Sequence, residues 1–164
     1  MSALPGKSEF RFEKRRVDAT ITLSSGESTN GCFFTANDDA RHSGPERVGD
    51  LLNAEPGFFP FEMHEGHDVC TVLYNRAHVV LVNLHEREER RDAGYQLATP
   101  RLVSILLSTG ERLMGAVRVY RPAGRDRLSD WTRQPETFRY VETADMTVLV
   151  NAAYIVHISE VSEP

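Results

Sequence analysis

The sequence predicts a mainly β protein made of two tandem five-stranded, strongly bent antiparallel barrels, each with a short helical insertion. Two observations predict this class. First, three blocks recur in the same order, which indicates an internal duplication; the matched segments are ITLSSGESTNGCFF and ILLSTGERLMGAVR, RVGDLLN and RLSDWTR, and TVLYNRAHVVLV and TVLVNAAYIVHI. Second, apolar and polar residues alternate on both sides of a glycine-containing turn in each copy, which is the pattern of a β-hairpin.

The two copies set the expected domain organisation. We expect a flexible N-terminal tail at residues 1–16, a first barrel at 17–84, a charged linker at 85–100 and a second barrel at 101–161. The tail contains no continuous apolar segment of the kind that forms a secretory signal. The linker mixes opposite charges before Gly94 and Pro100 interrupt any helix.

Each copy opens with a hairpin. An apolar-polar run leads into SSGE or STGE, where Gly26 and Gly110 are expected to supply the positive backbone φ that the turn requires. The second strand then follows the second glycine of each copy, which is Gly31 or Gly115.

The helical insertion comes next and carries a repeated Arg–Asp pair. Arg47 and Asp50 in the first copy recur as Arg127 and Asp130, and residues three apart share one face of a helical turn. A catalytic pair is one interpretation. We favour a structural one, in which the aspartate accepts hydrogen bonds at the start of the helix, because folding constraints act on every copy whereas active sites are usually single.

A short strand and a closing hairpin complete each copy. Phe58 and Phe138 begin the short strands FFPFE and FRYVE. Asn75 and Asn151 precede the last strands, where an Asn that bonds its own turn is the expected role.

These residues resemble the Sm-like proteins. VSILLSTGERLMGAVRVY is similar to the first Sm motif and MTVLVNAAYIVHI to the second; the RLSD unit also resembles a unit of bacterial proteins to which no function is attached. The resemblance implies a small bent barrel. RNA-binding members carry Asp and Asn in the loop after the second strand and an Arg-Gly pair in the final turn. Here the helical insertion replaces that loop and the turns read Asn75-Arg76 and Asn151-Ala152, so the nucleotide pocket is not carried over.

No catalytic residue, cofactor or metal site is predicted. His64 and His67 in EMHEGHD lie close together among carboxylates, and such a group is able to hold a divalent cation. An exposed acidic loop is the favoured interpretation, because no cysteine stands at ligand spacing. Cys32 and Cys70 lie in apolar strand-like runs, so buried free thiols in a reducing compartment are expected, and with them a cytoplasmic location. No apolar run approaches the ~20 residues that a membrane-spanning helix needs.

The two copies differ in charge. Residues 17–83 contain ten acidic and three basic residues, whereas residues 101–161 contain seven acidic and eight basic ones, all arginine. Opposite charges favour docking of one chain on another, and arginines also bind phosphates. The candidate contacts are Arg112, Arg118, Arg121, Arg125, Arg133 and Arg139.

The chain is therefore predicted to be a non-enzymatic module that acts through protein–protein contacts, in an assembly or adaptor role. Each barrel leaves an edge strand, and unprotected edges recruit further strands, so self-association is expected. The alternative is an Sm-like RNA-binding protein that uses the arginine-rich second copy. The net charge of −5 disfavours nucleic acid as the partner.

Overall fold

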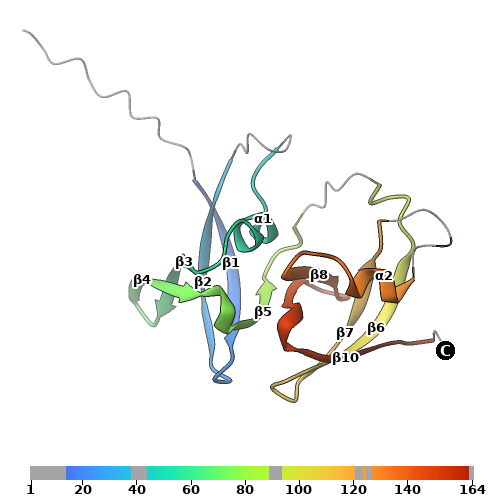
Figure 1. Cartoon of the computed structure of the whole chain (residues 1–164). Helices are drawn as coiled ribbons and strands as arrows, with labels where there is room; N and C mark the ends of the chain where they lie inside the picture. The colour runs from blue at the N-terminus through green and yellow to red at the C-terminus, as the bar shows by residue number, and fades with distance from the viewer. Residues whose placement is uncertain (1–13, 38–43, 89–93, 121–123, 125–126, 163–164) are drawn as a thin grey trace, which may run out of the picture.

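The mainly β prediction is confirmed. The computed structural model describes residues 14–37, 44–88, 94–120, 124 and 127–162, and its ten strands form one antiparallel sheet (Figure 1). In chain order the strands are β1 (Lys14–Leu23), β2 (Ser28–Ala36), β3 (Phe58–Glu65), β4 (Asp68–Asn75), β5 (Val79–Leu84), β6 (Pro100–Leu107), β7 (Arg112–Arg118), β8 (Phe138–Glu142), β9 (Thr147–Asn151) and β10 (Ile155–Glu160).

The strand order is the same in the two halves of this sheet. The first half runs β5-β1-β2-β3-β4 and the second runs β10-β6-β7-β8-β9, with β5 and β9 paired where the halves meet. Two separate closed barrels are not confirmed, because one ladder continues through both halves and the sheet does not close. Among the described strands, β4 pairs only with β3 and β10 only with β6. We call β4 and β10 the open edges.

Two hydrophobic cores lie along the sheet, and each contains residues from both halves. Phe138 and Leu149 of the second half pack in the core that holds Phe33 and Phe59. Val80 and Leu81 of the first half pack in the core around Trp131. Each half therefore needs the other to complete its hydrophobic core. Burial of apolar surface is the dominant favourable term in folding.

The predicted turn role of Gly26 and Gly110 agrees with the structure. Gly26 and Gly110 both have a φ of 90° in the β1–β2 and β6–β7 turns, a conformation that side chains with a Cβ rarely adopt. Gly31 and Gly115 lie inside β2 and β7 rather than before them as predicted, and they allow close packing of the next strand. A Cβ on Gly31 would lie 2.0 Å from the Glu62 carbonyl oxygen, and one on Gly115 would lie 2.8 Å from that of Glu142.

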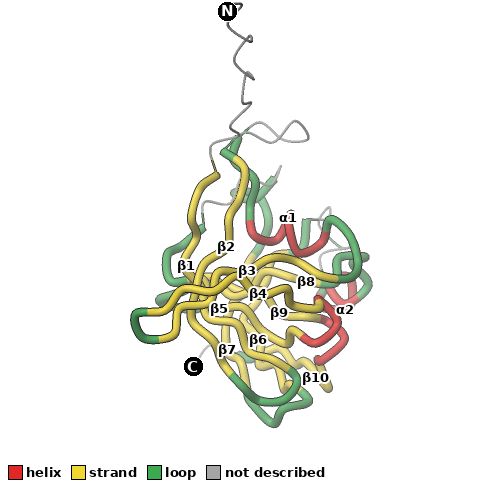
Figure 2. The backbone as a smooth tube through the Cα atoms, turned by 90° about the vertical axis from the view of Figure 1, so that its left-hand side faces the viewer, coloured by secondary structure: helices red, strands yellow, loops and turns green. Residues whose placement is uncertain are grey.

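Each Arg–Asp pair lies at the start of a helix. Asp50 Oδ2 accepts a bond of 3.1 Å from the Arg47 backbone N–H before α1 (Val48–Asn53), and Asp130 Oδ2 accepts one of 2.9 Å from Arg127 before α2 (Leu128–Thr132). The carboxylates thus satisfy backbone donors as the structural interpretation expects. Figure 2 shows both helices, in red, on the same side of the strands.

The asparagines close the last turn of each half. Asn75 and Asn151 both accept a bond of 3.0 Å from the backbone N–H two residues on, at the start of η1 (Arg76–His78) and η2 (Ala152–Tyr154). This bond fixes the turn into β5 and into β10, as predicted.

Three details differ from expectation. Strand β1 begins at Lys14, so residues 14–16 belong to the sheet because they pair with β2; residues 1–13 lie outside the described part. Cys70 is exposed rather than buried, since it lies on an open edge, whereas Cys32 is buried. Phe58 and Phe138 do not share one environment, for Phe58 is exposed and Phe138 buried.

No helix in the described residues is long and apolar enough to cross a membrane.

Candidate functional site

The junction of β5 and β9, which we call the seam, joins the two halves. Its register pairs Leu81 with Val150, Val82 with Leu149, and continues to Leu84 opposite Thr147. Every residue of β9 is buried, and in β5 only Asn83 is not. A strand edge is therefore fully covered here by another strand and by side chains.

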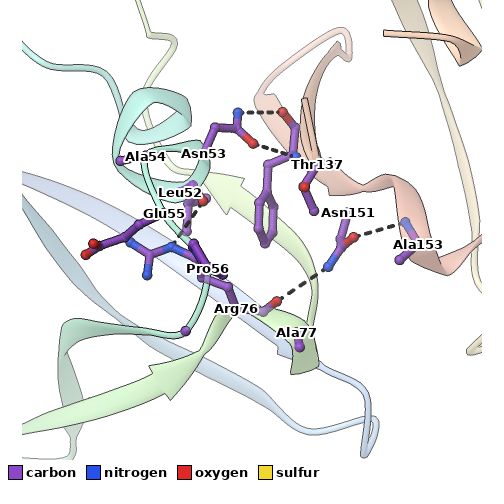
Figure 3. A pocket seen from close by; sticks show the side chains of 12 residues that line it. Leu52, Asn53, Ala54, Glu55, Pro56, Arg76, Ala77, Thr137, Asn151 and Ala153 are labelled. Atoms are coloured by element: carbon purple, nitrogen blue, oxygen red, sulfur yellow. Dashed lines mark hydrogen bonds between the residues drawn. The ribbon is translucent and has the colours of Figure 1, made fainter. Parts of the chain in front are cut away.

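Side-chain amides hold the seam at the end shown in Figure 3. Asn53 Nδ2 donates to the Phe138 carbonyl at 2.9 Å, and the Phe138 N–H donates to Asn53 Oδ1 at 2.8 Å. Asn151 Nδ2 donates to the Val79 carbonyl at 2.9 Å and lies 3.4 Å from that of Arg76. These amides satisfy buried backbone groups that belong to the opposite half, which would otherwise cost free energy.

A cavity of about 470 Å³ opens at this end of the seam. Residues from both halves line it, among them Asn53, Glu55, Arg76, Thr137 and Asn151 (Figure 3). The Arg76 guanidinium does not point to an open ligand position. It donates to the carbonyls of Leu51, Leu52 and Phe58 at 2.9, 3.1 and 2.8 Å, so it closes the end of α1. Burial lowers the pKa of Arg76 from its usual value.

A second polar cluster links the linker to both halves. Glu88 Oε2 accepts a bond of 3.0 Å from the Val48 N–H at the start of α1, and Glu88 Oε1 accepts one from the Tyr140 hydroxyl. The Tyr140 oxygen in turn accepts a bond of 3.0 Å from the Gly49 N–H. Burial raises the pKa of Glu88 and raises that of Tyr140 well above its ordinary value. Such shifts mark candidate acids or bases. Every group here already has a partner, however, so the cluster fastens the helix to β8.

Two of the candidate contact arginines are occupied within the chain. Arg139 donates to the carbonyls of Trp131 and Gln134 at 2.7 Å each, and its guanidinium stacks over the Trp131 ring. Arg118 donates to the Ala98 carbonyl at 2.9 Å and stacks over Tyr95. Both arginines therefore stabilise their own fold, a role that the sequence pattern does not indicate. The other predicted contacts either reach solvent, as Arg112 and Arg133 do, or lie outside the described residues, as Arg121 and Arg125 do.

Glu62 and Glu142, at matched positions of the two halves, each bind side chains from other parts of the chain. Glu62 Oε1 accepts a bond of 2.8 Å from Arg16, and Glu142 Oε1 accepts one from the Tyr95 hydroxyl while its other oxygen lies 3.6 Å from Arg118. The Glu62–Arg16 and Glu142–Tyr95 bonds each join segments that lie far apart in the sequence.

One group of metal-ligand side chains comes together in the described part of the chain. The Cys32 thiol, the Glu62 carboxylate and the His64 imidazole offer ligand atoms that all lie within 4.8 Å of one another. A hydrogen bond from His64 is the main cause that lowers the pKa of Glu62, whereas burial raises the pKa of the Cys32 thiol. From the sequence, His64 is expected beside His67 and nearby carboxylates, among them Glu62, and not beside Cys32. Cys32 comes close only through the pairing of β2 with β3, which sequence spacing does not display.

Comparison with models of protein families, with curated proteins and with solved structures finds no match to this chain. Two features of the geometry lie outside the seam: the two open edges and the Cys32–Glu62–His64 group.

Proposed function

We propose that this protein is a non-enzymatic assembly module whose partner is a second copy of the same chain, with the β4 edge of one copy pairing with the β10 edge of the next. In this proposal the two halves are copies of one unit, and the seam is the template for the contact between chains. Because β4 and β10 lie at opposite ends of the sheet, the contact is heterologous and repeats from chain to chain until the assembly closes.

The exposure of matched residues carries the proposal. Leu73 on β4 is 64% exposed, and its counterpart Leu149 in the seam is 0% exposed. Val156 on β10 is 59% exposed against 0% for its counterpart Val80. Phe58 is 62% exposed against 1% for Phe138. Leu73 and Val156 thus lie in water on strands that have no further neighbour in the chain, and Phe58 lies on β3, next to the β4 edge. Burial of such a side chain stabilises a contact by roughly 1.5–3 kcal/mol.

The seam also sets the register of the proposed contact. Val82 pairs with Leu149 in the seam, and the matching positions are Ile158 on β10 and Leu73 on β4. A strand pair shifted by one residue would turn Leu73 to the opposite face, so the apolar pattern favours a single register.

Asn75 supports the same geometry. Its counterpart Asn151 uses Oδ1 for its own turn and Nδ2 for carbonyls across the seam. Asn75 uses Oδ1 in the same way, and within the described residues its Nδ2 has no partner. The amide is thus in place to donate to the turn before β10 of another copy.

The RNA-binding alternative receives no support from Arg118 and Arg139, two of the six candidate contacts. Arg118 and Arg139 already bind carbonyls of their own chain, so a phosphate would have to displace those bonds.

Light scattering on the purified chain tests the proposal. The wild-type protein is expected to show a mass that is a whole multiple of 18.5 kDa, and Leu73→Asp is expected to return it to a single chain. Met114→Asp is the matched control, because Met114 is 55% exposed but lies on β7, away from both open edges. A wild-type monomer at high micromolar concentration would refute self-assembly.

A further inference from the structure

We infer that Cys32, Glu62 and His64 form a binding site for a divalent transition-metal ion, with Zn²⁺ the best fit. The three residues come from adjacent strands of the first half: Cys32 lies on β2, and Glu62 and His64 lie on β3. Cys32 and Glu62 are direct register partners, and residues two apart on a strand share a face, so all three side chains point to the same side of the sheet.

The distances match those of a tetrahedral ion. Cys32 Sγ lies 3.8 Å from Glu62 Oε1, and His64 Nε2 lies 3.1 Å from that same oxygen. Zinc–sulfur bonds of about 2.3 Å and zinc–nitrogen or zinc–oxygen bonds of about 2.0 Å require separations of roughly 3.5 Å for sulfur and oxygen and roughly 3.3 Å for nitrogen and oxygen. Shifts of a few tenths of an ångström therefore suit the two edges that meet at the Glu62 oxygen, while Cys32 Sγ and His64 Nε2 lie within 4.8 Å of each other. A water molecule supplies the fourth corner.

A side-chain cation already occupies this position. Arg16 Nη2 lies 2.8 Å from Glu62 Oε1 and 3.5 Å from His64 Nε2, and its charge also acts on the Cys32 thiol. The three groups thus converge on a positive charge. The Arg16 side chain is 57% exposed, so it is able to swing into water when a more compact dication arrives.

The second half shows that the fold does not need these donors. Ala116 pairs with Glu142 as Cys32 pairs with Glu62, and Ala144 follows Glu142 at the spacing at which His64 follows Glu62. The carboxylate is retained there, where Arg118 and Tyr95 bind it, while both other donors are alanine. The thiol and the imidazole are therefore additions specific to the first half.

The chemistry of the donors selects the metal. A thiolate favours borderline and soft ions over Ca²⁺ and Mg²⁺, and cysteine sulfur, histidine nitrogen and glutamate oxygen are each ligands of zinc. Because the thiol must lose its proton to bind, affinity is expected to fall as the pH is lowered.

Titration with Co²⁺ in the presence of a non-thiol reductant tests this site, because a cobalt–thiolate bond produces a near-ultraviolet charge-transfer band. We expect the band in the wild-type protein and in Cys70→Ser, and its loss in Cys32→Ser. His64→Gln is expected to weaken binding at least about tenfold, whereas His67→Gln, the matched histidine control, leaves it unchanged. Arg16→Gln is expected to tighten binding several-fold, since it removes the competing cation.

Thiol protection gives a second readout that leaves the three ligands intact. In Cys70→Ser the single thiol is Cys32, and Zn²⁺ is expected to slow its alkylation, whereas Mg²⁺ does not. Absence of a charge-transfer band in the wild-type protein, an equal band in Cys32→Ser, or equal alkylation rates with and without Zn²⁺ would each overturn the inference. Self-assembly through the open edges does not depend on any of these results.

Discussion

Asn53 binds both backbone polar groups of Phe138, although the two residues belong to different halves of the sheet. The amide donates to the Phe138 carbonyl at 2.9 Å and accepts from the Phe138 N–H at 2.8 Å. A side chain at the end of α1 thereby takes the place of a neighbouring strand for the first residue of β8. This two-bond contact couples the helical insertion of one half to the core of the other.

Asn53→Asp is expected to lower the free energy of unfolding by about 1–3 kcal/mol, because the new carboxylate cannot donate to the Phe138 carbonyl and repels it. Asn30→Asp is the matched control, since Asn30 is exposed and only its Oδ1 is used, as the acceptor from the Thr20 hydroxyl. Urea denaturation of both variants provides the measurement. An equal decrease in the free energy of unfolding in the two variants would show that the two hydrogen bonds between Asn53 and Phe138 do not stabilise the fold.

Arg76→Met is expected to cost about 3 kcal/mol of stability, because three carbonyls around the end of α1 lose their charged donor. Arg15→Met, at an exposed position on β1, is the control and is expected to change stability little. Hydrogen exchange adds a local readout, in which the α1 amides of Arg76→Met lose protection before those of β6. Unchanged protection of α1 would contradict the role given to Arg76.

The buried carboxyl of Glu88 predicts a pH dependence with a definite sign. Burial raises the pKa of Glu88 in the folded chain, so the folded state binds more protons than the unfolded state. The contribution of Glu88 to the free energy of unfolding is therefore stabilising at low pH, and it is lost as the pH rises through the folded-state pKa of this carboxyl. The unfolding free energy of the wild type minus that of Glu88→Gln should therefore be largest in acid and decline towards neutral pH.

The control for this series is Glu86→Gln, which removes an exposed carboxyl two residues away on the same segment. Denaturation of the wild type and both variants at a set of pH values gives the difference in unfolding free energy between the wild type and each variant. A wild-type minus Glu88→Gln difference that increases with pH would mean that the Glu88 carboxyl is not held in a desolvated site.

Replacing either of the matched glycines Gly31 and Gly115 by alanine is expected to lower stability, but by unequal amounts. Gly31→Ala places a Cβ 2.0 Å from a backbone carbonyl oxygen, which cannot move without shifting β3. In Gly115→Ala the nearest atoms are a Val141 methyl group at 2.7 Å and the Glu142 carbonyl oxygen at 2.8 Å, so the overlap with the backbone is smaller. Gly115→Ala is expected to cost about 1–3 kcal/mol and Gly31→Ala more. Thermal unfolding orders the two variants, and a smaller loss for Gly31→Ala would contradict the packing described for β2 against β3.

Local features of the fold were predictable because local patterns encode them. The turns at Gly26 and Gly110, the aspartates that accept bonds at the helix starts, and the turn-closing role of Asn75 and Asn151 all follow from residues a few positions apart. Each depends on one backbone conformation or one short-range bond.

The seam and the candidate sites were not predictable in this way. Pairing of β5 with β9 joins segments far apart in the chain, and that pairing turns two expected barrels into one sheet. The internal role of Arg139 likewise requires the position of Trp131 in space. Cys32 meets His64 only through strand register. Sequence spacing carries no direct signal for any of these contacts.

Disulfide trapping between two variants tests the proposed contact between chains most directly. In a Cys70→Ser background, Leu73→Cys and Ile158→Cys chains are mixed and oxidised, and the proposed register places the two residues opposite each other. Antiparallel partners have Cα atoms about 4.5–5.5 Å apart, within the range of a disulfide. The control mixes Leu73→Cys with Val156→Cys, two residues out of register. The account predicts a covalent two-chain species in the first mixture and little in the second; no species, or equal amounts in both mixtures, would contradict it.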